Sequence, residues 1–320
     1  MISVVMPAYN SEQFIAPAIQ SILDQTYTTF ELIIVDDGST DATGELIQRF
    51  ASRDDRIKII NGQHEGVGQA MNLGIGHAIY PWVAVMHADD IAMPQRLERQ
   101  LTAAQADPEV VIWGTDGYHI NSKNDVLSRF QVGPRSKMDC RQLRAKGKMV
   151  QAIHPTVMLN REVLIKVGNY DSTLDIAEDI ELFDRMLCYG DLVTIPENLL
   201  RYRIHGTSLS MEKNAKMHQI RLYVLARQKH RNQTGEELTY EAFKRQHTQR
   251  SLITKLLDYR ERMANFYYRR AGMAYGEKQY LKTGYYLSLS IMLRPIYPIQ
   301  RAWKQVLSPE ARQKTRLAKA

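Results

Sequence analysis

Short apolar segments recur along the first 120 residues of the chain, and a stretch with helical spacing follows each of them. We expect five strands here, at residues 2–6, 31–35, 56–60, 82–86 and 110–113. The segment 32–35 is apolar at every position, which is typical of a strand buried on both faces of a parallel sheet. Each gap between strands is long enough for a crossover helix. The sequence therefore predicts an α/β domain with a mixed, mostly parallel sheet flanked by helices.

The pattern changes after residue 113. Residues 115–150 are irregular and contain several glycines, so we expect loops with an antiparallel excursion there. Helical spacing returns at 161–167 and 178–189, and strand-like segments follow at 191–195 and 198–204. From residue 211 onward the spacing is helical almost throughout. We therefore predict an α/β domain at residues 1–210 and a basic helical C-terminal region at residues 211–320.

Composition narrows the class of protein. With 44% hydrophobic and 24% charged residues, the chain has globular composition, which excludes a disordered or collagen-like protein. Its apolar runs are too short to cross a bilayer, and its N-terminus lacks the pattern of a secretory signal. Cys140 and Cys188 are too few for a disulfide framework or a tetrahedral zinc site. We expect a cytoplasmic protein in a reducing compartment.

Charge is distributed unevenly along the chain. Residues 1–110 hold 6 basic and 15 acidic residues, whereas residues 211–320 hold 23 basic and 8 acidic ones. A basic region of this kind suits an anionic membrane surface, and the alternatives are solvated helix faces and, after them, a nucleic acid. Because no nucleic-acid-binding motif is readable, we favour a peripheral position at the inner face of the cell membrane and expect no nucleic-acid partner.

Acidic residues follow two of the predicted strands. In an open α/β sheet, ligands bind beyond the carboxyl ends of the strands. The pair Asp89-Asp90 has the chemistry of a site for a hard divalent cation with a diphosphate, although Asp90 could instead cap the helix that Pro94 opens. The turn at 36–41 could contact a base or ribose, or simply cap the next helix. Neither the phosphate-binding loop of nucleotide triphosphatases nor the dinucleotide-binding glycine motif is present.

Several motifs spread over residues 1–210 occur in the order found in one known family. They are MPAYN at 6–10, QTY at 25–27, IVDDGSTD at 34–41, GVGQAMNLGI at 66–75, ADDI at 88–91, RLERQ at 96–100, HPT at 154–156, ED at 178–179 and YRIH at 202–205. With these motifs the chain resembles the family 2 glycosyltransferases. The resemblance implies a GT-A fold, which is a Rossmann-like nucleotide-sugar-binding domain, and inverting transfer of a sugar from a nucleotide-diphosphate sugar, most simply a UDP-sugar, to a hydroxyl group.

The same resemblance implies roles for individual residues. Asp89 would bind Mg²⁺ or Mn²⁺ and bridge it to the diphosphate, as the metal ligand of a DxD-type motif. Asp179 would be the base that takes the proton from the acceptor hydroxyl, although in isolation its position would also suit the start of a helix. The residues expected to contact the nucleotide are Pro7, Ala8, Tyr9, Asp37 and His87.

Two positions depart from the family's pattern. His87 stands where the first acidic residue of the motif is usual, so we expect activity with an altered metal affinity or preference. Met71 replaces a common arginine, which removes one expected diphosphate contact. His205 could be a further metal ligand, and a lone histidine after a strand is also often structural.

The resulting functional hypothesis is a metal-dependent glycosyltransferase of surface polysaccharide or glycolipid synthesis. Its partners would be a nucleotide-sugar donor, a saccharide or lipid-linked acceptor and an anionic membrane surface. Because His87 replaces an acid, the alternative is a non-catalytic nucleotide-sugar-binding subunit or sensor.

Overall fold

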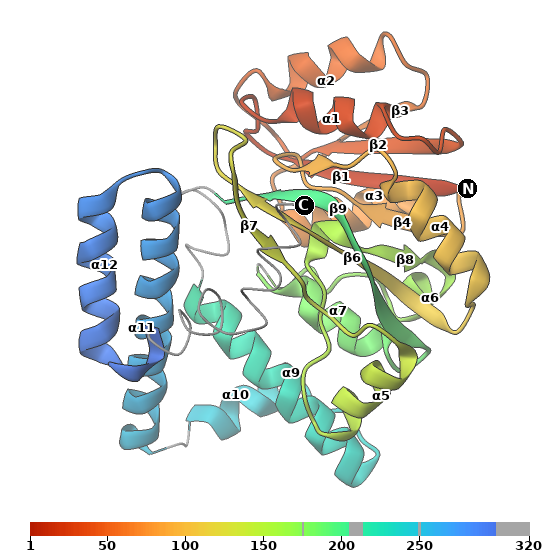
Figure 1. Ribbon diagram of the computed structural model, residues 1–320. Coiled ribbons are helices and arrows are strands. Elements are labelled where there is room, and N and C mark those ends of the chain that lie inside the picture. The colour runs from red at the N-terminus through yellow and green to blue at the C-terminus, as the bar shows by residue number, and fades with distance from the viewer. Residues whose placement is uncertain (175, 205–213, 249–250, 299–320) are drawn as a thin grey trace. The chain divides into compact units, whose positions relative to one another are not determined.

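The computed structural model describes residues 1–174, 176–204, 214–248 and 251–298 (Figure 1). The chain forms two compact units. The first contains residues 1–203 and 219–238, and the second contains residues 204–218 and 239–320.

One sheet organises the first unit. Within the described residues it has nine strands, in the order β3-β2-β1-β4-β8-β6-β9-β5, with β7 paired to β6. The bounds are β1 Ile2–Ala8, β2 Phe30–Asp36, β3 Ile57–Asn61, β4 Trp82–Val85, β5 Ile91–Ala92, β6 Val110–Ile120, β7 Val126–Phe130, β8 Met158–Asn160 and β9 Asp191–Arg203. Strands β3, β2, β1 and β4 pair in parallel, as do β6 and β9, whereas β5, β7 and β8 pair antiparallel to their neighbours. The predicted mixed, mostly parallel sheet is confirmed.

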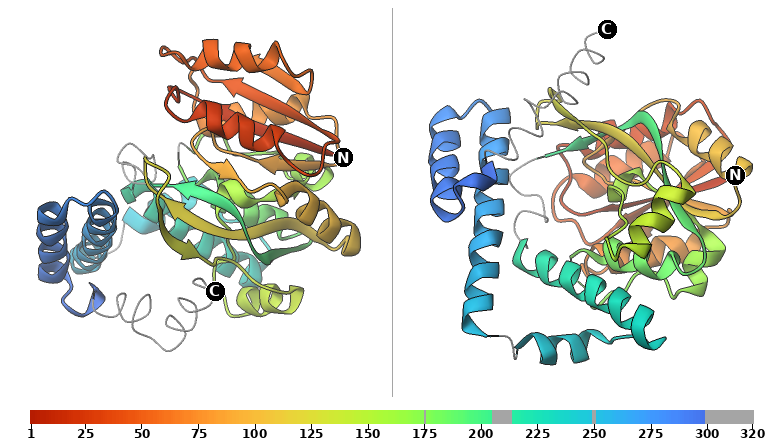
Figure 2. Two further views of the ribbon diagram at one scale, coloured as in Figure 1. Left: turned by 45° about the horizontal axis from the view of Figure 1, so that its top comes forward. Right: turned by 60° about the horizontal axis from the view of Figure 1, so that its bottom comes forward.

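Helices cover both faces of this sheet (Figures 1 and 2). Apolar residues of α1, α2 and α4 pack on one face, with alternate residues of β1 such as Val4 and Met6. Those of α3, α5, α6 and α7 pack on the other face, with Val5. This alternation follows from the two-residue repeat of a strand, which directs successive side chains to opposite faces. The bounds are α1 Ile15–Leu23, α2 Thr43–Ala51, α3 Val67–His77, α4 Arg96–Ala106, α5 Lys137–Ala145, α6 Arg161–Lys166 and α7 Glu178–Met186.

The region from 115 to 204 is more regular than expected. Strand β6 continues to Ile120, and β7 returns antiparallel to it, which confirms the predicted excursion. The two strands predicted at 191–195 and 198–204 are one strand, β9. Its pairing with β6 passes from Ile195 directly to Asn198, so residues 196–197 form a bulge that keeps the strand continuous.

The described helices that follow are α9 Asn214–Thr234, α10 Tyr240–Thr248, α11 Leu252–Gly276 and α12 Tyr280–Leu293. In the second unit α11 and α12 form an antiparallel pair, visible in both views of Figure 2, and the hydroxyl of Ser290 donates to the backbone oxygen of Ala264 across it. The predicted C-terminal helical region is therefore confirmed. Among the described helices, none combines the length and hydropathy needed to span a bilayer.

Candidate active site

The carboxyl end of β4 leads into a turn that contains His87, Asp89 and Asp90. Arg203, the last residue of β9, holds this turn in place. Its backbone N–H donates to Asp90 Oδ1 at 2.7 Å and its Nε donates to the backbone oxygen of Asp89 at 2.6 Å. The rest of its guanidinium donates to Asn121 and Asn124 in the β6–β7 turn, each at 2.7 Å. A single buried arginine thus ties three segments around the acidic turn.

The motif RLERQ lies behind this turn on α4. Arg96 is fully buried and donates to the backbone oxygen of Val85, the last residue of β4, at 2.8 Å. Gln100 donates to the backbone oxygens of Trp113 and Thr156. Asp90 does not cap α4, because Gln95 precedes that helix and the Asp90 carboxylate accepts from Arg203 instead. The capping alternative for Asp90 is therefore wrong.

Burial sets the charge states in the turn. Asp90 is fully buried, and its Oδ2 has no hydrogen-bond partner among the described residues. Burial, reinforced by the neighbouring Asp89, raises the pKa of Asp90 well above its usual value. The His87 ring, with its Nδ1 3.8 Å from Asp90 Oδ2, has its pKa lowered to about 4, mainly by burial and then by His154. His87 is therefore neutral at neutral pH.

These three side chains fit a divalent cation. Each offers one ligand atom, and the three atoms lie within 4.8 Å of one another. A buried carboxylate oxygen without a partner is costly unless something positive arrives. Carboxylate oxygens suit Mg²⁺ or Mn²⁺, and an imidazole nitrogen adds a ligand of the kind that transition metals prefer. His87, Asp89 and Asp90 are thus the residues that would hold an ion here, whereas the predicted ligand His205 lies outside the described residues.

Two buried rings extend inward from His87. His87 Nε2 lies 3.1 Å from His154 Nδ1, and His154 Nε2 lies 2.7 Å from the Tyr170 hydroxyl. Burial lowers the pKa of His154 to about 3 and raises that of Tyr170 well above its usual value. The HPT motif signals His154 in the sequence without giving it a role. Tyr170 has no signal in the sequence pattern at all.

Asp179 lies in the first turn of α7. Ala177, the residue just before this helix, has a φ of 59°, a left-handed conformation that is uncommon outside glycine and often found at functional sites. Burial raises the pKa of Asp179, while the backbone N–H of Ile180 and the charge of Arg221 oppose that rise. Asp179 in turn acts electrostatically on His87. The predicted base therefore interacts electrostatically with the turn that carries the acidic residues.

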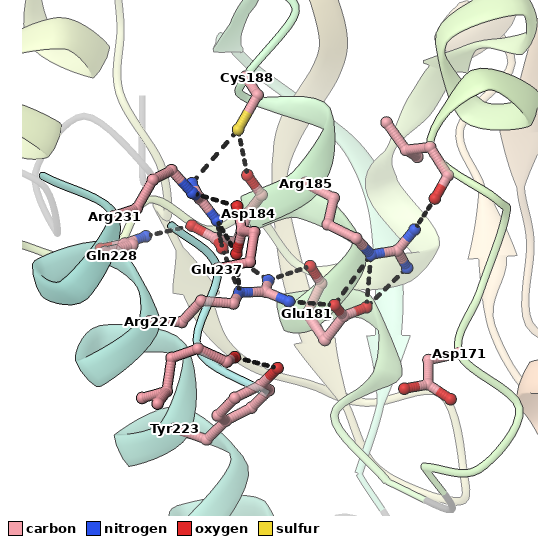
Figure 3. A network of polar contacts seen from close by, with 12 residues as sticks. Asp171, Glu181, Asp184, Arg185, Cys188, Tyr223, Arg227, Gln228, Arg231 and Glu237 are labelled. Atoms are coloured by element: carbon pink, nitrogen blue, oxygen red, sulfur yellow. Dashed lines mark hydrogen bonds and ion pairs between the residues drawn. The ribbon is translucent and has the colours of Figure 1, made fainter. Parts of the chain in front are cut away.

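An ion-pair network fixes the helix that carries Asp179 (Figure 3). Arg227 on α9 is 4% exposed and bonds Glu181 at 2.5 Å and Asp184 at 2.6 Å on α7. Arg231 bonds the same Asp184 at 2.9 Å, and Arg185 pairs with Glu181 within α7. Part of the basic charge of the C-terminal third is therefore neither solvated nor available to a membrane, because it neutralises buried acids of α7.

A second group of predicted residues lies at the ends of β1 and β2. Both carboxylate oxygens of Asp37 accept backbone hydrogen bonds, from Glu65 at 3.1 Å and Gly66 at 3.0 Å, just before α3. Tyr9 is 43% exposed, and its ring stacks on His64 with 4.1 Å between centroids. His64 has no signal in the sequence. The structure thus shows how this turn is built, with Asp37 anchoring the start of α3 beside an exposed aromatic pair.

The remaining predicted contacts are backbone or core residues. Ala8 is 3% exposed, and its backbone oxygen accepts from the N–H of Asp37 at 2.8 Å, while Pro7 precedes it at the end of β1. Met71 is fully buried in the core beneath α3. Its apolar side chain suits this core position. The arginine common in the family would need a charged partner there.

The chain is similar to known proteins in sequence and in fold. Residues 3–168 match the family model described as glycosyl transferase family 2. The O-antigen biosynthesis glycosyltransferase WbnJ of Escherichia coli is 30% identical over 213 residues, which are 65% of this chain and 81% of that protein. Among solved structures, Staphylococcus aureus TarS 1-349 in complex with UDP has a TM-score of 0.56 at 15% identity, over 92% of this chain and 90% of that one. The mannosyltransferase PcManGT of Pyrobaculum calidifontis, in complex with GDP-Man and Mn²⁺, has a TM-score of 0.53 at 16% identity, over 99% of this chain and 79% of that one.

Proposed function

The chain belongs to glycosyl transferase family 2 and has the GT-A fold, and from that premise we propose that it is an inverting, metal-dependent transferase that moves a sugar from a UDP-sugar to a hydroxyl group. The acceptor would be a saccharide or lipid-linked saccharide in the synthesis of a surface polysaccharide. The similarity to WbnJ supports the acceptor class, and the fold shared with TarS supports the uridine nucleotide.

One observation carries this proposal. A carboxylate with a raised pKa, Asp179, interacts electrostatically with His87, which lies in the same turn as Asp90, whose buried Oδ2 has no hydrogen-bond partner among the described residues. Burial of charge at two neighbouring positions weakens folding, so a role in chemistry explains it better than a role in stability. A base on one side and a cation site for the leaving diphosphate on the other are the two groups that sugar transfer needs.

The cation-holding residues and Asp179 would have different roles in the reaction. A divalent cation held by His87, Asp89 and Asp90 would supply Lewis-acid stabilisation of the charge that develops on the departing diphosphate. Asp179 accepts the proton of the acceptor hydroxyl as that oxygen attacks the anomeric carbon. Its raised pKa brings it closer to the operating pH, where a general base is most effective. A single displacement from the face opposite the leaving group inverts the anomeric centre.

The nucleoside would bind at the ends of β1 and β2. Tyr9 and His64 offer an exposed aromatic pair against which a base can stack. Asp37 holds the Glu65–Gly66 backbone beside this pair, so its part in the nucleotide site would be to shape the turn next to the stacking rings. Pro7 and Ala8 form the floor through their backbone.

Calorimetric titration with UDP, dTDP and GDP, each with and without Mn²⁺, tests the donor site. We expect metal-dependent binding of UDP that is lost in Asp89→Ala. Asp171→Ala, which alters a partly exposed turn aspartate, serves as the matched control and should bind as the wild type does. Absence of binding for all three nucleotides would contradict the proposal.

The substitution at His87 supports one other candidate, a nucleotide-sugar-binding subunit or sensor without turnover. It predicts nucleotide binding by the same titration but no transfer to any acceptor with any metal. Detection of sugar transfer, or of UDP release above the uncatalysed rate, would exclude it.

We also propose that the protein works at the cytoplasmic face of an anionic membrane. Helix α12 has no acidic residue, and it carries Lys282 between the exposed apolar side chains of Leu281 and Tyr285. Such a helix suits the interfacial region of a bilayer. The protein should sediment with anionic vesicles at low salt and should not sediment with neutral ones, whereas protein that stays in the supernatant with anionic vesicles would refute membrane binding.

A further inference from the structure

His87, His154 and Tyr170 form a hydrogen-bonded chain of side chains. A metal site made of carboxylates alone would not need it. The three groups of this chain are linked by contacts of 3.1 and 2.7 Å, and they run from the acidic turn into the core of the first unit. His154 is 7% exposed and Tyr170 is 2% exposed. A neutral imidazole carries one N–H and one lone pair, so this chain has only two consistent arrangements of its protons.

In the first arrangement the Tyr170 hydroxyl donates to His154, and His154 Nδ1–H donates to His87 Nε2. The remaining proton of His87 is then on Nδ1. The nearest carboxylate oxygen recorded for it is Asp90 Oδ2 at 3.8 Å, which is too long for a hydrogen bond. This arrangement leaves an N–H donor without a good acceptor in a largely buried place, which is costly.

In the second arrangement every ring N–H has an acceptor. His87 Nε2–H donates to His154 Nδ1, and His154 Nε2–H donates to the Tyr170 oxygen. Burial and the charges of Glu178 and Asp179 raise the pKa of Tyr170, so its hydroxyl keeps its proton and its oxygen can still accept from His154. The second arrangement is therefore favoured, and it leaves the Nδ1 lone pair of His87 unprotonated beside the acidic residues.

We propose that His154 and Tyr170 are positioning residues that hold His87 in this tautomer, so that His87 Nδ1 becomes a nitrogen ligand of the divalent cation beside Asp89 and Asp90. The inference rests on the proposed function for the presence of a cation. The distance of 3.8 Å between Nδ1 and Asp90 Oδ2 is compatible with two ligands of one ion, because ligand atoms about 2.1 Å from a cation lie at most about 4.2 Å apart.

A nitrogen ligand changes which ions bind well. Carboxylates and water suit Mg²⁺, whereas an imidazole raises affinity for later transition metals such as Co²⁺. The site should therefore favour Co²⁺ over Mg²⁺ more strongly than a site with an acid at position 87 would. His87→Asp creates that comparison within the same protein.

The tautomer can be tested without metal or nucleotide. Nitrogen NMR of protein labelled at histidine should show both His87 and His154 protonated at Nε2, with His87 assigned by the loss of its signals in His87→Asp. Tyr170→Phe should shift the His154 and His87 signals, while Tyr223→Phe, which removes another buried hydroxyl, should not. Protonation of both rings at Nδ1 would overturn the proposal.

Metal selectivity supplies the second test. With UDP present, His87→Asp should lower the ratio of Co²⁺ to Mg²⁺ affinity about tenfold, and Tyr170→Phe should lower Co²⁺ affinity by about as much, as is usual for loss of an outer partner of a ligand. The visible spectrum of bound Co²⁺ should change in His87→Asp. An unchanged ratio and spectrum would refute His87 as a ligand. Failure of the wild type to bind UDP would instead contradict the proposed function, and the NMR result would still decide the tautomer.

Discussion

The ends of β2 and β4 both carry clusters of aspartates, and the two clusters are built in opposite ways. After β2, the carboxylates accept backbone hydrogen bonds: Asp36 from Ser39, Asp37 from Glu65 and Gly66, and Asp41 from Glu12 and Thr43. After β4, Asp90 is fully buried with one oxygen lacking a hydrogen-bond partner among the described residues.

This difference separates structural acids from acids arranged for a ligand. Backbone donors around a carboxylate stabilise its charge within the protein itself, so the cluster after β2 shapes a loop. The cluster after β4 has its geometry fixed from behind by Arg203 while its charge is left incompletely compensated. Both clusters consist of aspartates, so the residue type does not distinguish them. Their hydrogen-bond donors do.

The largest expected effect concerns Asp179, the third acid on the side of the β4 cluster. Asp179→Asn should lower kcat about a thousandfold, because an amide cannot take the acceptor proton. Donor binding should stay unchanged in calorimetry, and the melting temperature should not fall, because burial already disfavours the charged form. A variant that keeps more than a tenth of wild-type kcat would remove Asp179 from the role of base.

At the β2 end, Asp37→Ala should chiefly affect stability. It removes the acceptors of two backbone N–H groups at the start of α3 and should lower the free energy of unfolding by about 2 kcal/mol. Denaturant titration measures this loss. Asp36→Asn is the matched control, since an amide oxygen can still accept from the N–H of Ser39. A fully stable Asp37→Ala protein would show that the two clusters do not differ as described.

Asp90→Asn should change the free energy of unfolding in the opposite direction from Asp37→Ala. The pKa of Asp90 is raised in the folded protein, so in the pH range between its ordinary value of 3.8 and the folded value only the unfolded chain has released the proton. Stability therefore falls as pH rises through that range, and the loss is complete above it. With chelator present, Asp90→Asn should be more stable than the wild type by about 1 kcal/mol near neutral pH, and this advantage should vanish as the pH approaches 4. A pH-independent difference would show that the Asp90 charge is compensated.

The smallest effect is expected at Asp41. Asp41→Ala removes the acceptor of the Thr43 N–H at the start of α2 and should cost about 1 kcal/mol or less. Hydrogen bonds from Thr43 and Glu12 outweigh burial and lower the pKa of Asp41, so its contribution is present above its ordinary pKa and fades as pH falls through the lowered value. Thermal melts of wild type and variant should converge in acid. Convergence at alkaline pH instead would contradict the assignment.

The strands of the sheet were predictable because the hydrophobic pattern of each strand lies within a few consecutive residues. Segments such as 32–35 are apolar at every position, which is typical of strands covered on both faces. The gaps between these segments are long enough for the crossover helices. The continuous strand β9 was predicted as two strands, because Pro196 resembles a strand end and the bulge opposite Thr115 and Asp116 depends on pairing with β6.

The site was predictable only where a motif names it. Asp89 and Asp179 lie in motifs, and both act electrostatically on His87. His64, Tyr170 and the backbone partners of Asp37 were missed, because each acts through a contact between segments far apart in sequence. The arginines of α9 were counted as surface charge for the same reason, since nothing near them in the sequence reveals Glu181 and Asp184.

The arrangement of α7 and α9 also bears on how the protein is made. Glu181 is separated from Arg227 by 46 residues, and Asp184 by 43, so both acids emerge from the ribosome well before the arginine that neutralises them. Domains generally fold as units during synthesis, starting from the N-terminus. The sheet can assemble early, but the helix bearing Asp179 gains its full support only after α9 has been synthesised. Completion of α9 is therefore the step in translation at which the helix that carries Asp179 can first become rigid.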